Sequence, residues 1–425
     1  MDCSHATKSL SPLSGCVIDA KIIREGRCVY LEKKDESGGI HRNIIEKDQE
    51  FYDFLTQRKA SEQIPSVAVM LYISSRCQMN CPVCYESSEN PEMSRQEIKE
   101  LIKRYKGHTI CLCGREPTCR EDLPQIIKLI SKNNNSLLMT NGLKLADYEY
   151  CLKLKRSGLK GVVFSFDGFD DRIFEVTDGR GYLSEKLKAL DNLKRLKINT
   201  VLSVTICPGV NDTEIDKLFN YCCENRSFIS QLRLRSVSPV GRHLNVEARC
   251  PSEMLDLVVR ELDIDKDHVI KELEFWSVFY REVPWCPENL KNNNMPKLCS
   301  FFFHVKRCQK KNIALGQRIN IKRIMRSRIK IFWLCYYLFR LYGIRYMIEG
   351  VCNTYGFRKI GINKTVLPVV IKCWPNAHNI DLNENNKCTS LYYKNGKMQP
   401  FCYYNIIEGI YAQDNPESRE NEGHS

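Results

Sequence analysis

Histidine is scarce in this chain of 425 residues, which has only eight, and the usual catalytic arrangements of polar side chains are absent. The histidines form no HExxH pair or similar metal-binding spacing. No convincing Ser/His/Asp triad or pair of acidic residues stands out. The sequence therefore offers no catalytic acid, base or nucleophile of these classes, and we predict no catalytic side chain.

Segments that direct a chain to a membrane are also lacking. Residues 1–15 have neither a basic start nor an apolar core, so we expect no signal peptide and a cytoplasmic protein. In a reducing compartment the 22 cysteines indicate metal sites or packing rather than disulfides. Packing alone explains the cysteines within regular helical or strand patterns, which are Cys151, Cys207, Cys222 and Cys223.

Asp and Glu are fewer than Lys and Arg, which gives the chain a formal net charge of +13. Basic residues occur along the whole chain and no nucleic-acid-binding motif is present, so we expect no nucleic-acid partner. The densest basic patch, Arg318 to Arg345, surrounds the apolar block Ile331 to Phe339. Nine apolar residues cannot span a bilayer, which needs about 20. Two interpretations stay open: a helix docked on the core, which we favour, or peripheral contact of residues 318–346 with a membrane surface.

The most informative motif follows the apolar run Val67 to Ile73. It places Cys77, Cys81 and Cys84 on one short loop, in a C-x3-C-x2-C spacing that ends at Tyr85. Three thiolates can hold three irons of a [4Fe–4S] cluster, and the fourth iron is then open to a substrate or cofactor. A zinc site on the Cys81/Cys84 pair is the alternative. Structural zinc wants four ligands, however, and no matching C-x2-C pair follows.

Strand-like and helix-like segments alternate from residue 67 to residue 241. The predicted strands are Val67–Ile73, Thr109–Leu112, Ser136–Met139, Gly161–Phe166, Asn199–Ile206 and Gln231–Val237. The predicted helices are Ser94–Tyr105, Glu121–Lys132, Asp147–Ser157, Ser184–Leu196 and Thr213–Cys223. Ser94, with Glu97 three positions on, marks the start of the first helix. This order predicts an α/β fold, a partial (β/α)6 barrel with a parallel sheet and outer helices. In such barrels the reactive groups lie at the C-terminal strand ends.

Less regular regions flank this core. Residues 1–66 hold a predicted hairpin of Val17–Ile23 and Arg27–Glu32, and residues 67–242 form the barrel. Residues 243–412 are a mixed, Cys-bearing region, with a helix near Pro251–Glu261. The polar tail, residues 413–425, is expected to be disordered.

The three-cysteine loop with its trailing aromatic residue resembles the cluster loop of the radical SAM superfamily. The resemblance implies a [4Fe–4S] cluster on Cys77, Cys81 and Cys84, with S-adenosylmethionine (SAM) on the open iron. The second strand ends in Cys113-Gly-Arg-Glu-Pro-Thr118, where the superfamily usually has Gly-Gly-Glu-Pro. Arg115 replaces the second glycine, so we expect a slightly different SAM pose.

Further SAM contacts are implied at the ends of the strands. Together with the turn after the second strand, the resemblance implies Gly114, Glu116, Pro117, Thr118, Asn141, Ser165 and Asp167. Glu116 adds an anion for the ammonium group of SAM. Arg235, on the sixth strand, either reaches an anionic group in the barrel mouth or lies in solvent.

The stretch from Ile371 to Asn405 resembles the tail of a multi-cluster branch. That branch includes archaeal tetraether lipid synthases and 7,8-dihydro-6-hydroxymethylpterin dimethyltransferases. The resemblance implies an auxiliary [4Fe–4S] cluster with Cys299, Cys388 and Cys402 as its best ligands and Cys286 next, followed by Cys308 and Cys373. Scattered core thiols are the alternative.

The N-terminal region departs from the pattern of that branch, whose members open with a small iron or zinc knuckle. Ser11, Ser14 and Asp35 stand where its metal ligands would be. Serine is a poor ligand for soft metals, so we expect the fold of the knuckle without its metal.

The resemblance implies a radical SAM enzyme that cleaves SAM reductively to a 5′-deoxyadenosyl radical and takes hydrogen from an unactivated C–H bond. It would methylate a pterin-like compound or couple lipid chains, as a methyltransferase-like or C–C bond-forming enzyme. Its partners would be a small-molecule or lipid substrate and a reductant such as ferredoxin or flavodoxin. A radical SAM enzyme that modifies a peptide or protein is one alternative, and a non-catalytic SAM- or cluster-binding relative is another.

Overall fold

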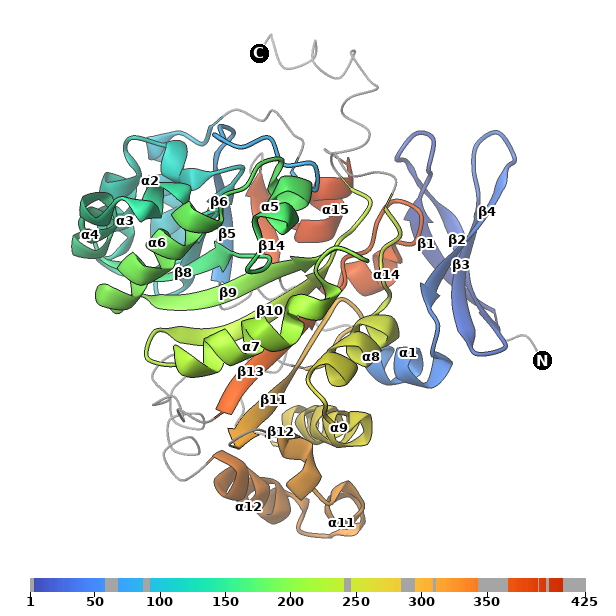
Figure 1. Ribbon diagram of the computed structural model, residues 1–425. Coiled ribbons are helices and arrows are strands. Elements are labelled where there is room, and N and C mark those ends of the chain that lie inside the picture. Colours follow the sequence, from blue (N-terminus) through green and yellow to red (C-terminus); the bar gives the residue numbers. More distant parts are fainter. Residues whose placement is uncertain are drawn as a thin grey trace.

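The computed structural model describes residues 4–57, 68–86, 92–240, 246–283, 295–308, 311–342, 366–388, 390–394 and 397–407. These residues form a four-stranded antiparallel sheet near the N-terminus and a larger, mostly parallel sheet of 11 strands (Figure 1). Cys286 and the predicted tail 413–425 lie outside the described residues.

The N-terminal sheet pairs its strands in chain order. They are β1 (His5–Leu10), β2 (Val17–Glu25), β3 (Cys28–Lys34) and β4 (Ile40–Glu46), followed by helix α1 (Gln49–Thr56). The turn between β2 and β3 contains Gly26 at φ +59°, a conformation that glycine adopts readily, so the predicted hairpin is confirmed. β1, β4 and α1 were not predicted.

Six parallel strands at the centre of the large sheet follow the predicted ranges closely. They are β5 (Ala68–Ser74), β6 (Thr109–Gly114), β7 (Asn135–Thr140), β8 (Leu159–Ser165), β9 (Asn199–Ile206) and β10 (Ile229–Ser236). Each pairs in parallel with the next. All six therefore present their C-terminal ends at one edge of the sheet.

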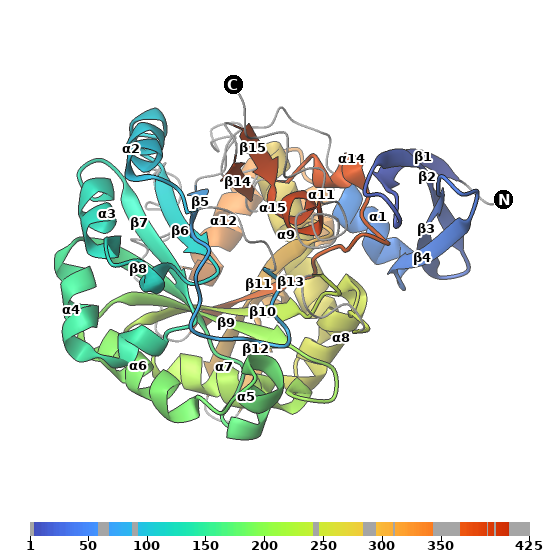
Figure 2. The same cartoon turned by 90° about the horizontal axis from the view of Figure 1, so that it is seen from above.

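Helices between these strands pack on the outer face of the sheet, which curves in Figure 2. They are α2 (Arg95–Arg104), α3 (Leu123–Ile130), α4 (Tyr148–Arg156), α5 (Asp171–Asp178), α6 (Leu183–Arg195) and α7 (Ile215–Glu224). Short 3-10 turns precede three of them: η1 (Pro117–Cys119), η2 (Leu143–Ala146) and η3 (Asp212–Glu214). Ser94 and Glu97 form the capping box expected at the start of α2. α5 was not predicted.

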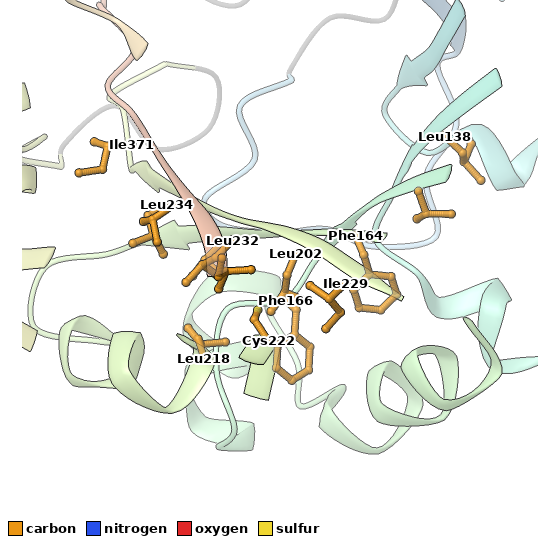
Figure 3. Packing of buried hydrophobic residues seen from close by; sticks show 14 of the residues in the cluster. Leu138, Phe164, Phe166, Leu202, Leu218, Cys222, Ile229, Leu232, Leu234 and Ile371 are labelled. Carbon is orange, nitrogen blue, oxygen red and sulfur yellow. The ribbon is translucent and has the colours of Figure 1, made fainter. Parts of the chain in front are cut away.

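Apolar side chains between the sheet and these helices form the main core. Phe166 and Leu202 lie next to Cys222 of α7, and Phe164 lies farther along the same face of the sheet (Figure 3). Leu202, Phe164 and Phe166 have no exposed surface. Cys222 is part of this core, in agreement with its predicted packing role.

Strands from the last third of the chain extend the sheet on both sides. β13 (Val366–Lys372) pairs in parallel with β10, and β11 (Ser300–Cys308) and β12 (Lys311–Ala314) follow it in antiparallel order. At the opposite edge β14 (Leu391–Lys394) pairs with β5 and with β15 (Lys397–Pro400). In the described residues the strand order runs from β12 to β15 without closing, so the barrel is partial.

The remaining helices belong to the C-terminal region. They are α8 (Pro251–Glu261), α9 (Lys266–Glu282), α11 (Ile321–Arg326), α12 (Lys330–Tyr342), α14 (Leu382–Asn385) and α15 (Phe401–Ile406), with the turn η4 (Leu315–Arg318). The predicted helix at Pro251–Glu261 is confirmed as α8. Among the described residues, none of these helices is long and apolar enough to cross a membrane.

Candidate functional site

Three cysteines lie together on the loop that follows β5. Cys77, Cys81 and Cys84 are partly buried and line one cavity of about 220 Å³ at the C-terminal ends of the strands. The backbone N–H of Cys84 donates to the carbonyl of Cys81 at 3.2 Å, and Met79 N donates to the Cys77 sulfur at 3.4 Å. The loop therefore turns all three thiols toward the same space.

Burial keeps the thiols of Cys77 and Cys81 protonated in the free protein. It raises the pKa of Cys77 to about 11 and the pKa of Cys81 further, with the carboxylate of Asp178 adding to the shift at Cys81. Thiolate is the form that binds iron, so a metal that enters this cavity must displace protons.

The donor set fits an iron–sulfur cluster. Thiolates are the usual ligands of such clusters, and the loop supplies three to one cavity. In the part of the chain that the structure describes, no three His, Cys, Asp or Glu side chains converge as they would around a single metal ion. A cubane is wider than one ion, so its ligands need not converge in that way.

The turn after β6 is held tightly against the start of the cysteine loop. Gly114 has φ +125°, and a Cβ at this position would lie 2.3 Å from the carbonyl oxygen of Ser74. The next two backbone N–H groups donate to Ser74 O at 2.9 Å and to Arg76 O at 3.0 Å. Only glycine fits here, and it lets the turn line the cavity with Gly114 and Arg115.

Glu116 lies behind this wall rather than in it. Its carboxylate has no exposed surface and accepts hydrogen bonds from Thr118 N, Thr118 Oγ1, Thr140 Oγ1 and Asn141 N at 2.6–3.0 Å. Pro117 and Thr118 are also buried and do not line the cavity. The carboxylate that we expected to meet an ammonium group instead joins the turn after β6 to the end of β7.

The other predicted contacts do line the cavity. Asn141, Ser165, Asp167 and Arg235 come from the ends of three strands, β7, β8 and β10. Asn141 Nδ2 lies 3.8 Å from the sulfur of Cys77. Arg235 Nη2 donates to Thr205 Oγ1 at 2.8 Å, and its guanidinium lies 5.2 Å from the ring centre of Trp374. Of the two interpretations of Arg235, the structure favours the barrel mouth over solvent.

A buried ion pair beside the cysteine loop was missed from the sequence. Lys186 of α6 is fully buried; its Nζ lies 2.9 Å from Asp178 Oδ2 and donates to the carbonyl of Ser165 at 3.0 Å. Asp178 ends α5, and Gly179 then packs against the backbone of Asn80 in the cysteine loop. The only signal in the sequence is a Lys within an otherwise regular helix, which ordinarily faces solvent.

Asp167 is buried close to this pair. Its Oδ1 accepts a hydrogen bond from Thr205 N at 2.6 Å. Burial, and then the carboxylate of Asp178, raise the pKa of Asp167 to about 6, although Lys186 and Arg235 oppose the shift.

We therefore expect Asp167→Asn to stabilise the unloaded protein above pH 6. The unfolded carboxyl ionises near pH 3.8 but the folded one only near pH 6, so folding loses stability as pH rises through this window. The asparagine variant escapes that loss, and its free energy of unfolding should rise by about 3 kcal/mol at neutral pH. Urea unfolding at pH 5 and pH 7.5 measures the gain, which should grow with pH. An asparagine variant that is less stable than the native protein at pH 7.5 would mean that the attraction of Asp167 to Lys186 and Arg235 outweighs the cost of its burial.

A second cavity of about 500 Å³ brings together the cysteines of the C-terminal region. Cys299, Cys373, Cys388 and Cys402 all line it, and so does Cys250, which was not predicted. Cys373 N donates to the carbonyl of Cys299 at 3.2 Å. Burial and the nearby Cys388 thiol raise the pKa values of Cys299 and Cys402. Cys308, at the end of β11, does not line this cavity.

Aromatic rings separate the two cavities. Trp374 lines both. Tyr85, which follows Cys84, has its ring centre 4.5 Å from that of Trp374 and 5.4 Å from that of Phe401, the neighbour of Cys402. The ring centres of Trp374 and Phe401 are 4.7 Å apart. The cysteine loop and the second group of cysteines thus face each other across one aromatic layer.

In the N-terminal region, hydrogen bonds join the loops where relatives would have a metal. Ser11 Oγ donates to Glu36 Oε2 at 2.6 Å, and Ser14 Oγ donates to Glu36 Oε1. Asp35 Oδ2 and His41 Nε2 are 2.6 Å apart. The residues at the knuckle positions therefore hold these loops through oxygen and nitrogen contacts.

Comparison with known proteins identifies the central part of the chain. A family profile described as the radical SAM superfamily matches residues 71–222, which contain the cysteine loop and β5 to β9.

Two relatives extend the comparison. The chain is 28% identical over 334 residues to the 7,8-dihydro-6-hydroxymethylpterin dimethyltransferase of Methanocaldococcus jannaschii, covering 69% of this chain and 65% of that protein. It is 31% identical over 212 residues to the GTP 3′,8-cyclase of Clostridium perfringens, covering 46% of this chain and 62% of that enzyme. The matches thus span slightly less than two thirds of each relative.

Solved structures with some similarity include Streptococcus suis SuiB bound to S-adenosylmethionine, at TM-score 0.40 and 15% identity over 45% of this chain and 46% of that one. A radical SAM methyltransferase from Sphaerobacter thermophilus matches at TM-score 0.32 and 12% identity over 57% of this chain and 74% of that one.

Proposed function

We propose that the chain is a radical SAM enzyme that takes a hydrogen atom from an unactivated C–H bond of a small molecule, and the match of residues 71–222 to the radical SAM profile supports this. In this proposal Cys77, Cys81 and Cys84 hold a [4Fe–4S] cluster, and SAM binds in the same cavity. The overall reaction would be methylation of a pterin-like ring.

One observation supports this proposal above the others. The three thiols share a cavity with Asn141, Ser165, Asp167 and Arg235, which come from the ends of three different strands. Parallel α/β folds bind their ligands at this edge, so an iron ligand set and a polar binding surface meet there.

The residues around the cavity suit the polar groups of SAM. The Arg235 guanidinium is a donor for a carboxylate, and Asn141 adds amide groups next to Cys77. Asp167, Ser203 and Thr205 supply oxygen atoms for hydroxyl or ammonium groups. Glu116 positions Asn141 by accepting its backbone N–H.

When bound, the cluster and SAM supply a reductive cleavage of the C5′–S bond, and the resulting 5′-deoxyadenosyl radical abstracts hydrogen. This chain then needs to exclude water and hold the substrate, not to move protons, which agrees with the lack of a predicted catalytic side chain. A reductant such as ferredoxin or flavodoxin would supply the electron.

The second cavity is the proposed place for the substrate and an auxiliary cluster. Cys299, Cys388 and Cys402 supply three thiols there, and Cys373 and Cys250 are nearby. Trp374 lines both this cavity and the proposed SAM site, and its ring packs against Tyr85 and Phe401, so a substrate held there would lie beside the SAM site.

A pterin-like ring is preferred to lipid chains because of the extent of one match. The pterin dimethyltransferase aligns over 334 residues, well beyond the radical SAM region at 71–222. That enzyme also belongs to the branch whose tail resembles Ile371 to Asn405.

Anaerobic reconstitution tests the proposal. Protein loaded with iron and sulfide, then given dithionite and SAM, should release 5′-deoxyadenosine. Adding a dihydropterin and methyl-labelled SAM should transfer label to the pterin. Release of 5′-deoxyadenosine without labelled pterin would reject the substrate but keep the reaction class. A loaded cluster that yields no 5′-deoxyadenosine would favour a non-catalytic binding role.

A further inference from the structure

Helices α11 and α12 lie at the lower end of the molecule in Figure 1, and an exposed apolar stripe runs along them. It consists of Met325, Ile329, Phe332, Tyr336 and Phe339, which are 38–60% exposed. Phe332, Tyr336 and Phe339 are spaced four and three residues apart and so share one face of α12, whereas Met325 lies on α11 and Ile329 in the turn between the two helices. They are five of the eleven large hydrophobic side chains that are this exposed in the described residues.

Folding does not account for the stripe, because another face of α12 already packs on the protein. Leu334, Tyr337, Leu338 and Leu341 are buried in a cluster with Phe275 and Phe279 of α9. The expected docked helix is therefore present. A helix that is apolar on a second, exposed face has surface left over for a partner.

The positive charge of the protein is concentrated here rather than spread along the chain. Residues 289–348 contain 14 Lys and Arg and no Asp or Glu. The other 365 residues contain 50 Lys and Arg against 51 Asp and Glu, so this segment accounts for the whole net charge.

Cations flank the apolar stripe directly. The guanidinium carbon of Arg323 lies 3.7 Å from the ring centre of Trp333, and Arg340 Nη1 donates to the hydroxyl of Tyr336 at 3.4 Å. Lys330 pairs with Glu282 at 3.5 Å. Lys322, Arg326 and Arg328 are exposed as well.

We propose that the face formed by α11 and α12 docks on a membrane surface rich in anionic phospholipid. Aromatic and aliphatic side chains can enter the boundary between headgroups and acyl chains while the cations meet lipid phosphates. A second copy of this chain fits poorly, because two such faces would bring like charges together. Nucleic acid explains the cations but not the aliphatic Met325 and Ile329. The proposal is independent of the reaction proposed above.

Co-sedimentation of the full chain with vesicles tests the proposal. The protein should sediment with phosphatidylcholine/phosphatidylglycerol vesicles at a ratio of about 7:3 and at least ~tenfold less with pure phosphatidylcholine, since the flanking cations act only on an anionic surface. Phe332→Ser with Phe339→Ser should lower binding at least ~tenfold, since it removes buried apolar area from the complex. Arg326→Glu with Arg328→Glu should do the same and weaken the salt dependence.

Matched controls use exposed residues elsewhere. Leu13→Ser with Ile40→Ser removes two exposed apolar side chains, and Lys153→Glu with Arg156→Glu reverses two exposed charges on α4. Both controls should bind vesicles like the native chain, and circular dichroism should be unchanged in all four variants. Equal binding of native chain and stripe variants, no binding to anionic vesicles, or binding to RNA alone would each overturn the proposal. Stripe-dependent dimerisation without vesicle binding would do so too.

Discussion

Replacing Cys81 with alanine is expected to abolish the release of 5′-deoxyadenosine and to remove about four iron atoms per chain, the content of one cluster. The reason is geometric, because Cys81 is the middle of three thiols that line one cavity, and no other cysteine among the described residues lines it. Two thiols hold a cubane poorly. Iron analysis and product chromatography after anaerobic reconstitution measure both effects.

Cys223→Ala is the matched control for this variant. Cys223 is also partly buried, but it lies on the outer helix α7 and lines neither cavity. It should keep the native iron content and activity. Full iron content and activity in the Cys81 variant, or equal losses in both variants, would show that the three-cysteine loop does not hold the cluster.

Cys388→Ala is expected to have the second large effect, a loss of iron without a loss of SAM cleavage. This result would distinguish the cysteines of the C-terminal region from those of the three-cysteine loop. Cys388 lines the cavity of about 500 Å³ with Cys299 and Cys402, on the far side of Trp374 from Cys81. The variant should lose about four iron atoms per chain. It should still cleave SAM to 5′-deoxyadenosine, because the cysteine loop is intact, but product formation from the substrate should fall.

Cys308→Ala serves as its control, because Cys308 is a partly buried cysteine of the same region that does not line the cavity. It should behave as the native protein does. Native iron content in the Cys388 variant would mean that Cys299, Cys388 and Cys402 are core thiols, which was the alternative from the sequence.

The parallel core could be predicted from sequence because its signals are local. Asn199–Ile206 was predicted to the residue, and Ser94 with Glu97 marked the start of α2 correctly. Alternating apolar segments and capping residues act within a few positions of each other.

Contacts between distant segments could not be predicted in this way. β13 pairs with β10 across more than 130 residues of chain, and β14 extends the other edge. The burial of Glu116 depends on donors from Thr118, Thr140 and Asn141, and the pairing of Lys186 depends on an unpredicted helix, α5. No local pattern carries such information, since each group is satisfied by a partner elsewhere in the chain.

The site residues show the same difference between local signals and contacts between distant segments. The cysteine spacing is a local signal, and its three thiols do share one cavity. Cys299, Cys388 and Cys402 were grouped by resemblance, and the fold places them together although 103 positions separate the first from the last. Cys250 and Trp374 had no comparable signal, because their place in the site depends on the tertiary fold.

Electron paramagnetic resonance of the reduced, anaerobically reconstituted protein tests most directly whether the loop leaves one iron open. Adding SAM should change the g-values of a [4Fe–4S] signal in the native chain and in Cys388→Ala, and Cys81→Ala should lack that response. A loop that holds zinc, or an iron signal that SAM leaves unchanged, would contradict the account.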